Sequence, residues 1–278
     1  MRRLLLVALL VAATPCFGAV QYEFTQVTRS DSQLAAPVRL IGRAVVEGDR
    51  SRVDYLEGST AGAGSYVVST NGSRDLLIVD PSTQTFARRH ATDASRRLDT
   101  LGVKISNLKL ELGDSVRGPN IAGYPTTYWR LIATFDITVM IGSIPISQHV
   151  TTTIEKWTTE DFGDVLPSFF VRSPYQTGDS ELDRLIEAET TRISGFPLRQ
   201  VITVSSRLAD QGRAAAVNAS SRNQRTEVLV TSIVRSTVQD SFFQVPPGFR
   251  EASEVAAEKD PGGVHILSMT EESKKDER

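Results

Sequence analysis

The sequence predicts a mainly β fold, in which about ten strands form one curved antiparallel sheet with a helix over it. The strongest evidence is the segment 121–157, which folds back on itself at Gly142–Pro145. Successive side chains of a strand point to opposite faces, and from Trp129 to Ile141 every odd position is apolar. The return arm, Ile146–Trp157, is rich in β-branched residues, which favour strands. We therefore expect a long antiparallel hairpin at the centre of the sheet.

Other strands are indicated by alternating apolar and polar residues and by turn dipeptides. Gly48-Asp49 and Asn71-Gly72 are typical of two-residue hairpin turns. Together these signals predict nine further strands, at residues 20–29, 38–47, 50–57, 65–70, 74–80, 84–88, 103–112, 198–208 and 226–238.

One clear helix is predicted at Glu181–Ile193, and a second, short helix is predicted within 91–101. Asp179 or Ser180 can cap the longer helix, Gly195 ends it, and proline two residues later prevents a restart. An isolated helix this short is marginal in water, so it must bury its apolar stripe, which consists of Leu182, Leu185, Ile186 and Ile193.

The first 19 residues have the pattern of a secretory signal peptide. Arg2 and Arg3 form the positive end, Leu4–Ala13 the apolar core, and Gly18 and Ala19 the small-residue exit. The apolar run is shorter than the roughly 20 residues that span a bilayer. We expect an exported, periplasmic protein with no transmembrane span after cleavage.

Cys16 is the only cysteine and lies inside this leader. Pro15 directly before it is a poor match to the signal of bacterial lipoproteins, which argues against lipid anchoring at Cys16. Without the leader the chain has no thiol, and this excludes disulfides, cysteine nucleophiles and thiolate metal sites.

The charge balance is mildly acidic. The whole chain has 31 Lys and Arg against 33 Asp and Glu. Without Arg2 and Arg3 the formal charge is 29 − 33 = −4, which argues against a dedicated nucleic-acid binder. Residues 20–251 are predicted to form one domain, and 252–278 a charged, flexible tail.

No set of residues indicates catalysis, a metal site or a cofactor. His90, His149 and His265 are far apart in sequence, and His149 suits a partly exposed strand position better than a general base. The acidic residues within 161–183 are not spaced as the ligands of a calcium-binding loop are. No Gly-x-Ser-x-Gly motif is present, so a hydrolase is the weakest class, and we expect a protein that is not an enzyme.

Four short motifs carry a family resemblance. They are the turn Ile121–Pro125, the strand end Glu155–Trp157, the strand start Gly195–Leu198 and the closing segment Phe243–Phe249. They resemble the LolA/LolB-like group of bacterial periplasmic lipoprotein carriers and receptors, with allied lipoprotein-sorting-like domains, over most of the mature chain. This chain differs from the carriers in having no clear N-terminal helix.

The resemblance implies an incomplete β-barrel with helices over an open, apolar concave face, which holds acyl chains in the carriers. The complete prediction is a mainly β (α+β) fold. In it, a single curved antiparallel sheet of about ten or eleven strands forms an incomplete β-barrel covered by one or two helices. The helix at 181–193 would be a lid over the face of Trp129, Leu131 and Phe135, hinged at Gly195–Pro197.

The predicted ligand-binding residues are apolar side chains of this concave face, of the lid and of an apolar flap at 166–171. They are Trp129, Leu131, Phe135, Ile137, Trp157, Leu185, Phe169 and Phe170. Ordinary core packing also accounts for the large ones, because burying each is worth about 2–3 kcal/mol.

The hypothesis is a non-enzymatic periplasmic binding protein for a lipid, lipoprotein or other amphipathic ligand. The alternative is an envelope protein-protein interaction or sensing module that uses the curved sheet as a docking surface.

Overall fold

The computed structural model describes residues 18–31, 36–58, 63–70, 75–90, 104–141, 143–163, 165, 192–208 and 222–252. These residues form one thirteen-stranded sheet. The strands are β1 (Ala19–Ser30), β2 (Val38–Glu47), β3 (Arg50–Glu57), β4 (Tyr66–Thr70), β5 (Asp75–Asp80), β6 (Thr85–His90), β7 (Lys104–Leu112), β8 (Val116–Arg117), β9 (Thr127–Ile141), β10 (Ile144–Thr159), β11 (Phe196–Leu208), β12 (Arg222–Ser236) and β13 (Arg250–Glu251).

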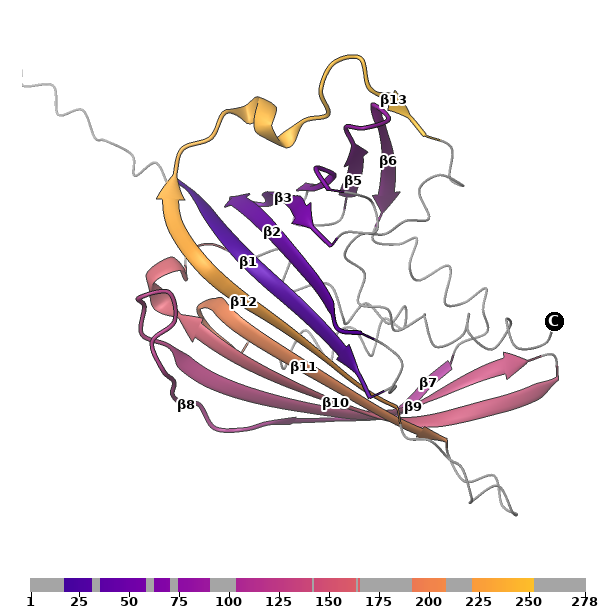
Figure 1. Cartoon of the computed structure of the whole chain (residues 1–278). Coiled ribbons are helices and arrows are strands. Elements are labelled where there is room, and N and C mark those ends of the chain that lie inside the picture. Colours follow the sequence, from indigo (N-terminus) through magenta and orange to yellow (C-terminus); the bar gives the residue numbers. More distant parts are fainter. Residues whose placement is uncertain are drawn as a thin grey trace, which may run out of the picture.

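The N-terminal strand β1 lies at the centre of the sheet. The strand order is β13-β6-β5-β4-β3-β2-β1-β12-β11-β10-β9-β7, and β8 also pairs with β9. All pairs are antiparallel except β13 with β6. The sheet curves strongly (Figure 1), but the described residues of β7 and β13 do not pair, so it is not closed into a barrel. Mainly β character and an open, curved sheet are therefore confirmed.

The number of strands is a correction, because the structure has thirteen rather than ten or eleven. The eleven longer strands match the predicted segments. The two additional ones, β8 and β13, have only two residues each. Strands this short carry no alternation, and β13 exists because the chain returns to the edge of β6, where Arg250 lies opposite Thr85.

The prediction of one or two covering helices is wrong for the described part of the chain. There the only helical segments are two short 3-10 turns, η2 (Glu160–Phe162) and η3 (Asp240–Phe243). Residues 91–101 and 181–191 lie outside the described residues, and the last two residues of the longer predicted helix, Arg192 and Ile193, are turn and coil. Gly195, where the sequence predicts a helix end, is in the left-handed conformation directly before β11.

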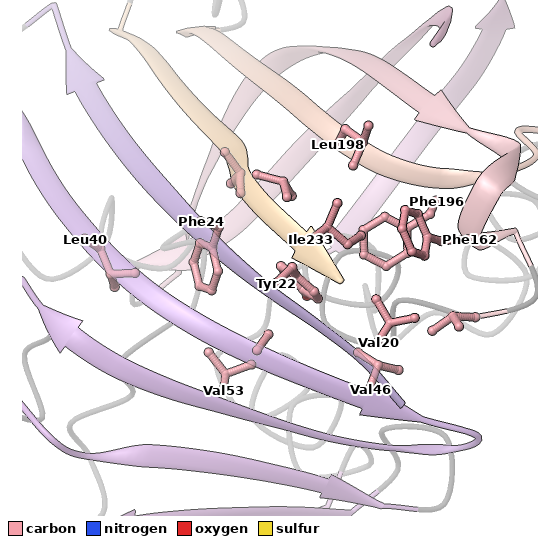
Figure 2. Close-up of a cluster of buried hydrophobic side chains, with 14 of the residues drawn as sticks. Val20, Tyr22, Phe24, Leu40, Val46, Val53, Phe162, Phe196, Leu198 and Ile233 are labelled. Carbon is pink, nitrogen blue, oxygen red and sulfur yellow. The ribbon is translucent and has the colours of Figure 1, made fainter. Parts of the chain in front are cut away.

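The main core lies on one face of the central strands, which we call the core face. It is the face from which Val20, Tyr22 and Phe24 of β1 project, and all three are fully buried. Figure 2 shows side chains of β1, β2, β3, β11 and β12 gathered on it. Loops cover one end of this cluster, because Phe162 of η2 contacts Phe196 at 6.1 Å between ring centroids.

The opposite, or reverse, face is covered at β2–β6 by the segment after β12. Phe243 of η3 is buried there with Tyr66 and Val68 of β4. Two arginines of β3 also hold this segment. The guanidinium of Arg52 lies 3.6 Å from the centroid of the Tyr66 ring and donates to the Phe242 carbonyl, while Arg50 donates to Asp240. In Figure 1 the segment runs from β12 through η3 to β13.

Gly58 gives a prediction on the turn after β3. Its φ is +76°, and a Cβ there would lie 1.8 Å from the carbonyl oxygen of Arg39. Gly48 has φ +59° with nothing within 4 Å of its would-be Cβ. We expect Gly48→Ala to lower the free energy of unfolding by about 1 kcal/mol and Gly58→Ala by about 2 kcal/mol. Equal losses in urea denaturation would contradict the close approach of Arg39.

Candidate functional site

The candidate site is the core face of strands β9, β10, β11 and β12. Residues directly opposite each other in antiparallel strands share a face. Ile154 of β10 is paired with Leu131 of β9 and with Ile202 of β11. These three side chains are buried and form their own apolar cluster. In β11 the core face also carries Leu198 of the main core, so the two clusters belong to one continuous face.

Four of the predicted ligand-binding residues lie on this face. Trp129, Leu131, Phe135 and Ile137 occupy alternate positions of β9, an uninterrupted strand that pairs in regular register with β10. Leu131 is buried, and the other three are half-buried. The indole Nε1 of Trp129 donates to Thr158 Oγ1 at 3.1 Å, which holds the ring in one orientation.

Trp157 is separated from these residues, because it lies on the reverse face. It is paired with Tyr128 and not with Trp129, and its ring lies 5.0 Å from that of Tyr128. The guanidinium of Arg199 sits 4.5 Å from its centroid, and Arg199 also forms an ion pair with Glu227. The packing of the Trp157 ring between Tyr128 and Arg199 accounts for a tryptophan at this position, so no ligand contact is needed to explain it.

The other three predicted residues, Phe169, Phe170 and Leu185, lie outside the described residues, as does the flap at 166–171. Most of the predicted leader and tail, residues 1–17 and 253–278, also lies outside them. The strand predicted to start the domain begins at Ala19, which is buried and paired with Ser236 of β12.

Lys156 is the most unusual residue of the core face, and it is not among the predicted site residues. It lies between Trp129 of β9 and Gln200 of β11 in the pairing, and only 7% of its surface is exposed. Burial lowers the pKa of its ammonium group to about 8. The signal was present in the sequence, because Lys156 shares the period-2 register of Ile154 and therefore its face.

A polar depression on the reverse face is lined by His149, which the sequence analysis weighed as a general base. It has a volume of about 370 Å³ and lies between β7, β9 and β10. Asn107 donates to one carboxylate oxygen of Asp136 at 2.6 Å, and His149 Nδ1 lies 2.8 Å from the other. Both contacts, that of Asn107 first, hold the pKa of Asp136 below its usual range.

Among the described residues, His149 is hydrogen-bonded to Asp136. Ion pairs that serve only the fold also shift pKa values, so the lowered pKa of Asp136 does not by itself mark a catalytic site. Asn107 has a positive φ of 57° at an irregularity in the pairing of β7, and its bond to Asp136 supports that bulge. The group is best explained as structural.

The described part of the chain contains no group of three or more His, Cys, Asp or Glu side chains placed to hold a metal ion. It also contains no helix of the length and apolar character needed to cross a membrane.

The chain is similar to the crystal structure of a LolA superfamily protein from Nitrosomonas europaea, with 10% sequence identity and a TM-score of 0.31. The aligned part covers 83% of this chain and 91% of that chain. No family model matches the sequence, and no curated protein matches it. At this level the likeness does not assign the chain to the family.

Proposed function

We propose that this protein is a non-enzymatic periplasmic binding protein for a lipid or another amphipathic ligand, held against the core face of β9–β12. The observation that carries the proposal is the contrast between the two faces of these strands. The core face presents the buried cluster of Leu131, Ile154 and Ile202. The reverse face carries ion pairs and hydrogen bonds, such as that from the Tyr128 hydroxyl to Glu155 at 2.8 Å.

The apolar surface of the core face continues beyond this buried cluster. Phe135 and Ile137 extend it along β9 towards the end of the hairpin, and both are only half-buried. Half-buried aromatic and aliphatic side chains in a continuous row are typical of a surface that receives an apolar ligand. The periplasmic location rests on the leader pattern of residues 1–19.

Ligand capture is the direct test. The protein, purified under native conditions from a membrane-containing host, is extracted and analysed by mass spectrometry, and then titrated with a fluorescent acyl probe. We expect a co-purified amphiphile and saturable probe binding. Ile137→Asp, which puts a charge on the core face, should weaken probe binding tenfold or more, because a carboxylate is costly beside an apolar ligand.

The matched control is Met140→Asp, since Met140 lies on the reverse face of the same strand and is 47% exposed. It should leave probe affinity unchanged, with both variants checked for thermal stability. An empty protein that binds no probe would count heavily against the proposal.

The alternative is an interaction module for another envelope protein. It is favoured by large apolar side chains at one end of the sheet, where the β9–β10 hairpin extends beyond β1 and β2 (Figure 1). Ile144 is 63% exposed and Leu208 51% exposed. Crosslinking in envelope fractions separates the two candidates, because a stoichiometric protein partner without bound lipid would favour the interaction module.

A further inference from the structure

One end of the sheet is open in the described part of the chain. Strand β7 is the last in the strand order and pairs with β9 along one side only. At the opposite end the chain's own segment β13 pairs with β6, and Glu251 forms a salt bridge with Arg88. An open edge is a row of backbone donors and acceptors that can pair with a further strand.

Alternate backbone groups of β7 point away from the sheet. The N–H of Gly113, directly after β7, donates to the Arg130 carbonyl of β9 at 2.9 Å. The direction of the backbone groups alternates along an antiparallel strand, so the N–H and C=O groups of Leu112 and Leu110 point outwards. A strand added at this edge would form its hydrogen bonds with these two residues.

The side chains at this edge alternate between apolar and charged. Leu110 and Leu112 are paired with core-face residues of β9, and both are half-buried. Lys109 and Glu111 lie on the reverse face and are exposed. In the described part of the chain neither of them forms an ion pair. Two opposite charges therefore flank Leu110, one on each side along the strand.

We propose that β7 pairs edge to edge with β7 of a second copy of this chain, about a two-fold axis at Leu110. Such a pair is antiparallel, and each residue contact occurs twice. In this register Lys109 lies opposite the partner's Glu111, and Glu111 lies opposite the partner's Lys109. Residues 108–112, Leu-Lys-Leu-Glu-Leu, are thus complementary to themselves in both charge and apolar pattern.

The register suits the backbone and the side chains together. Leu110 and its copy exchange two hydrogen bonds, because their backbone groups point outwards. Lys109 and the partner's Glu111 then form a non-hydrogen-bonded pair, in which side chains are closest. Opposite charges in direct opposition stabilise strand pairing, and like charges destabilise it. The apolar core face also continues across the axis, from Leu110 of one copy to Leu110 of the other.

The charges favour a second copy over an unrelated strand. Lysine side chains and bulges commonly protect edge strands from pairing, and the irregularity between Ser106 and Lys109 confines regular pairing to the residues that follow it. An unrelated strand would need an acidic residue opposite Lys109 and a basic one opposite Glu111. A second copy supplies both by symmetry. Because the paired stretch is short, we expect a dimer that dissociates on dilution.

The dissociation constant of this dimer is measured by sedimentation equilibrium of the full chain at low ionic strength, over a range of concentrations. Glu111→Lys places lysine opposite lysine at both symmetric positions, and Lys109→Glu places glutamate opposite glutamate. Each change should weaken the dimer by about tenfold or more. The double variant, in which the two charges are exchanged, should regain the wild-type dissociation constant.

Mixing the two single variants tests the register directly. In a heterodimer of Lys109→Glu with Glu111→Lys, every charged position again faces an opposite charge, so the mixture should dimerise although neither variant does so alone. Glu57→Lys is the matched control, because Glu57 is an exposed glutamate at the end of β3. It carries the same change of charge and should leave the dimer unchanged.

Leu110→Pro tests the backbone pairing. Proline lacks the outward N–H at the axis but is tolerated on an edge strand where that N–H faces solvent. We expect loss of the dimer with thermal unfolding close to that of the wild type.

Every other outcome overturns the proposal. A protein that stays monomeric at all concentrations would contradict the pairing of two copies. A dimer that survives Leu110→Pro and both charge reversals would use another surface. A dimer that the single charge reversals weaken, but that neither the double variant nor the mixture restores, would contradict the axis at Leu110.

Discussion

Lys156→Met is expected to stabilise the ligand-free protein by about 3 kcal/mol at pH 7. Burial lowers the pKa of Lys156 from 10.5 to about 8, and each pKa unit corresponds to about 1.4 kcal/mol. At neutral pH the folded state therefore holds a protonated amine in surroundings that disfavour it. Methionine has a similar shape without the charge, so the penalty disappears. Chemical denaturation at pH 7 measures the gain directly.

The pH dependence of this gain has a definite sign. Below pH 8 the amine is protonated in both the folded and the unfolded state, so the wild type carries the full penalty. Between pH 8 and 10.5 the unfolded state binds the proton and the folded state does not, so wild-type stability rises with pH relative to the variant. The advantage of Lys156→Met should shrink across this window. A constant or negative difference would show that Lys156 is not a buried, unpaired cation.

Phe196→Ala is expected to lower the free energy of unfolding by about 3–5 kcal/mol, as for other buried phenylalanines. Phe196 opens β11 and is fully buried. Its ring lies 5.3 Å from that of Tyr22 in β1 at an interplanar angle of 75°, and it also contacts Phe162 of η2. Truncation would open a cavity where the central strand, β11 and the covering loop meet (Figure 2).

Phe196→Leu is the matched control, because leucine keeps most of the apolar volume and should cost less than about 1.5 kcal/mol. Urea denaturation gives both values, provided that the slope with denaturant stays constant. A loss below 1 kcal/mol for Phe196→Ala would place Phe196 outside the cooperative core. A large loss for both variants would point to the edge-to-face geometry of the rings rather than to volume.

The candidate site was partly predictable. Strict alternation from Trp129 to Ile141 placed Leu131, Phe135 and Ile137 on one face, because the period of two is a property of the strand itself. Trp157 was grouped with them because it is large and apolar, but its odd position in β10 pairs it with Tyr128 and puts it on the reverse face. The register of β10 relative to β9, which alternation in the sequence leaves open, decided on which face Trp157 lies.

The sequence by itself determined the mainly β class and the bounds of the longer strands, because hairpin turns and alternation are local signals. It did not determine the central place of β1, which pairs with β12 about 200 positions away. It also did not determine the two-residue strands, because these form only where the folded chain comes back to the edge of another strand. Tertiary structure alone decided that Lys156 lies buried beside Gln200. A lysine in a strand is ordinarily solvated, and only the folded structure, which places this one between Trp129 and Gln200, leaves it 7% exposed.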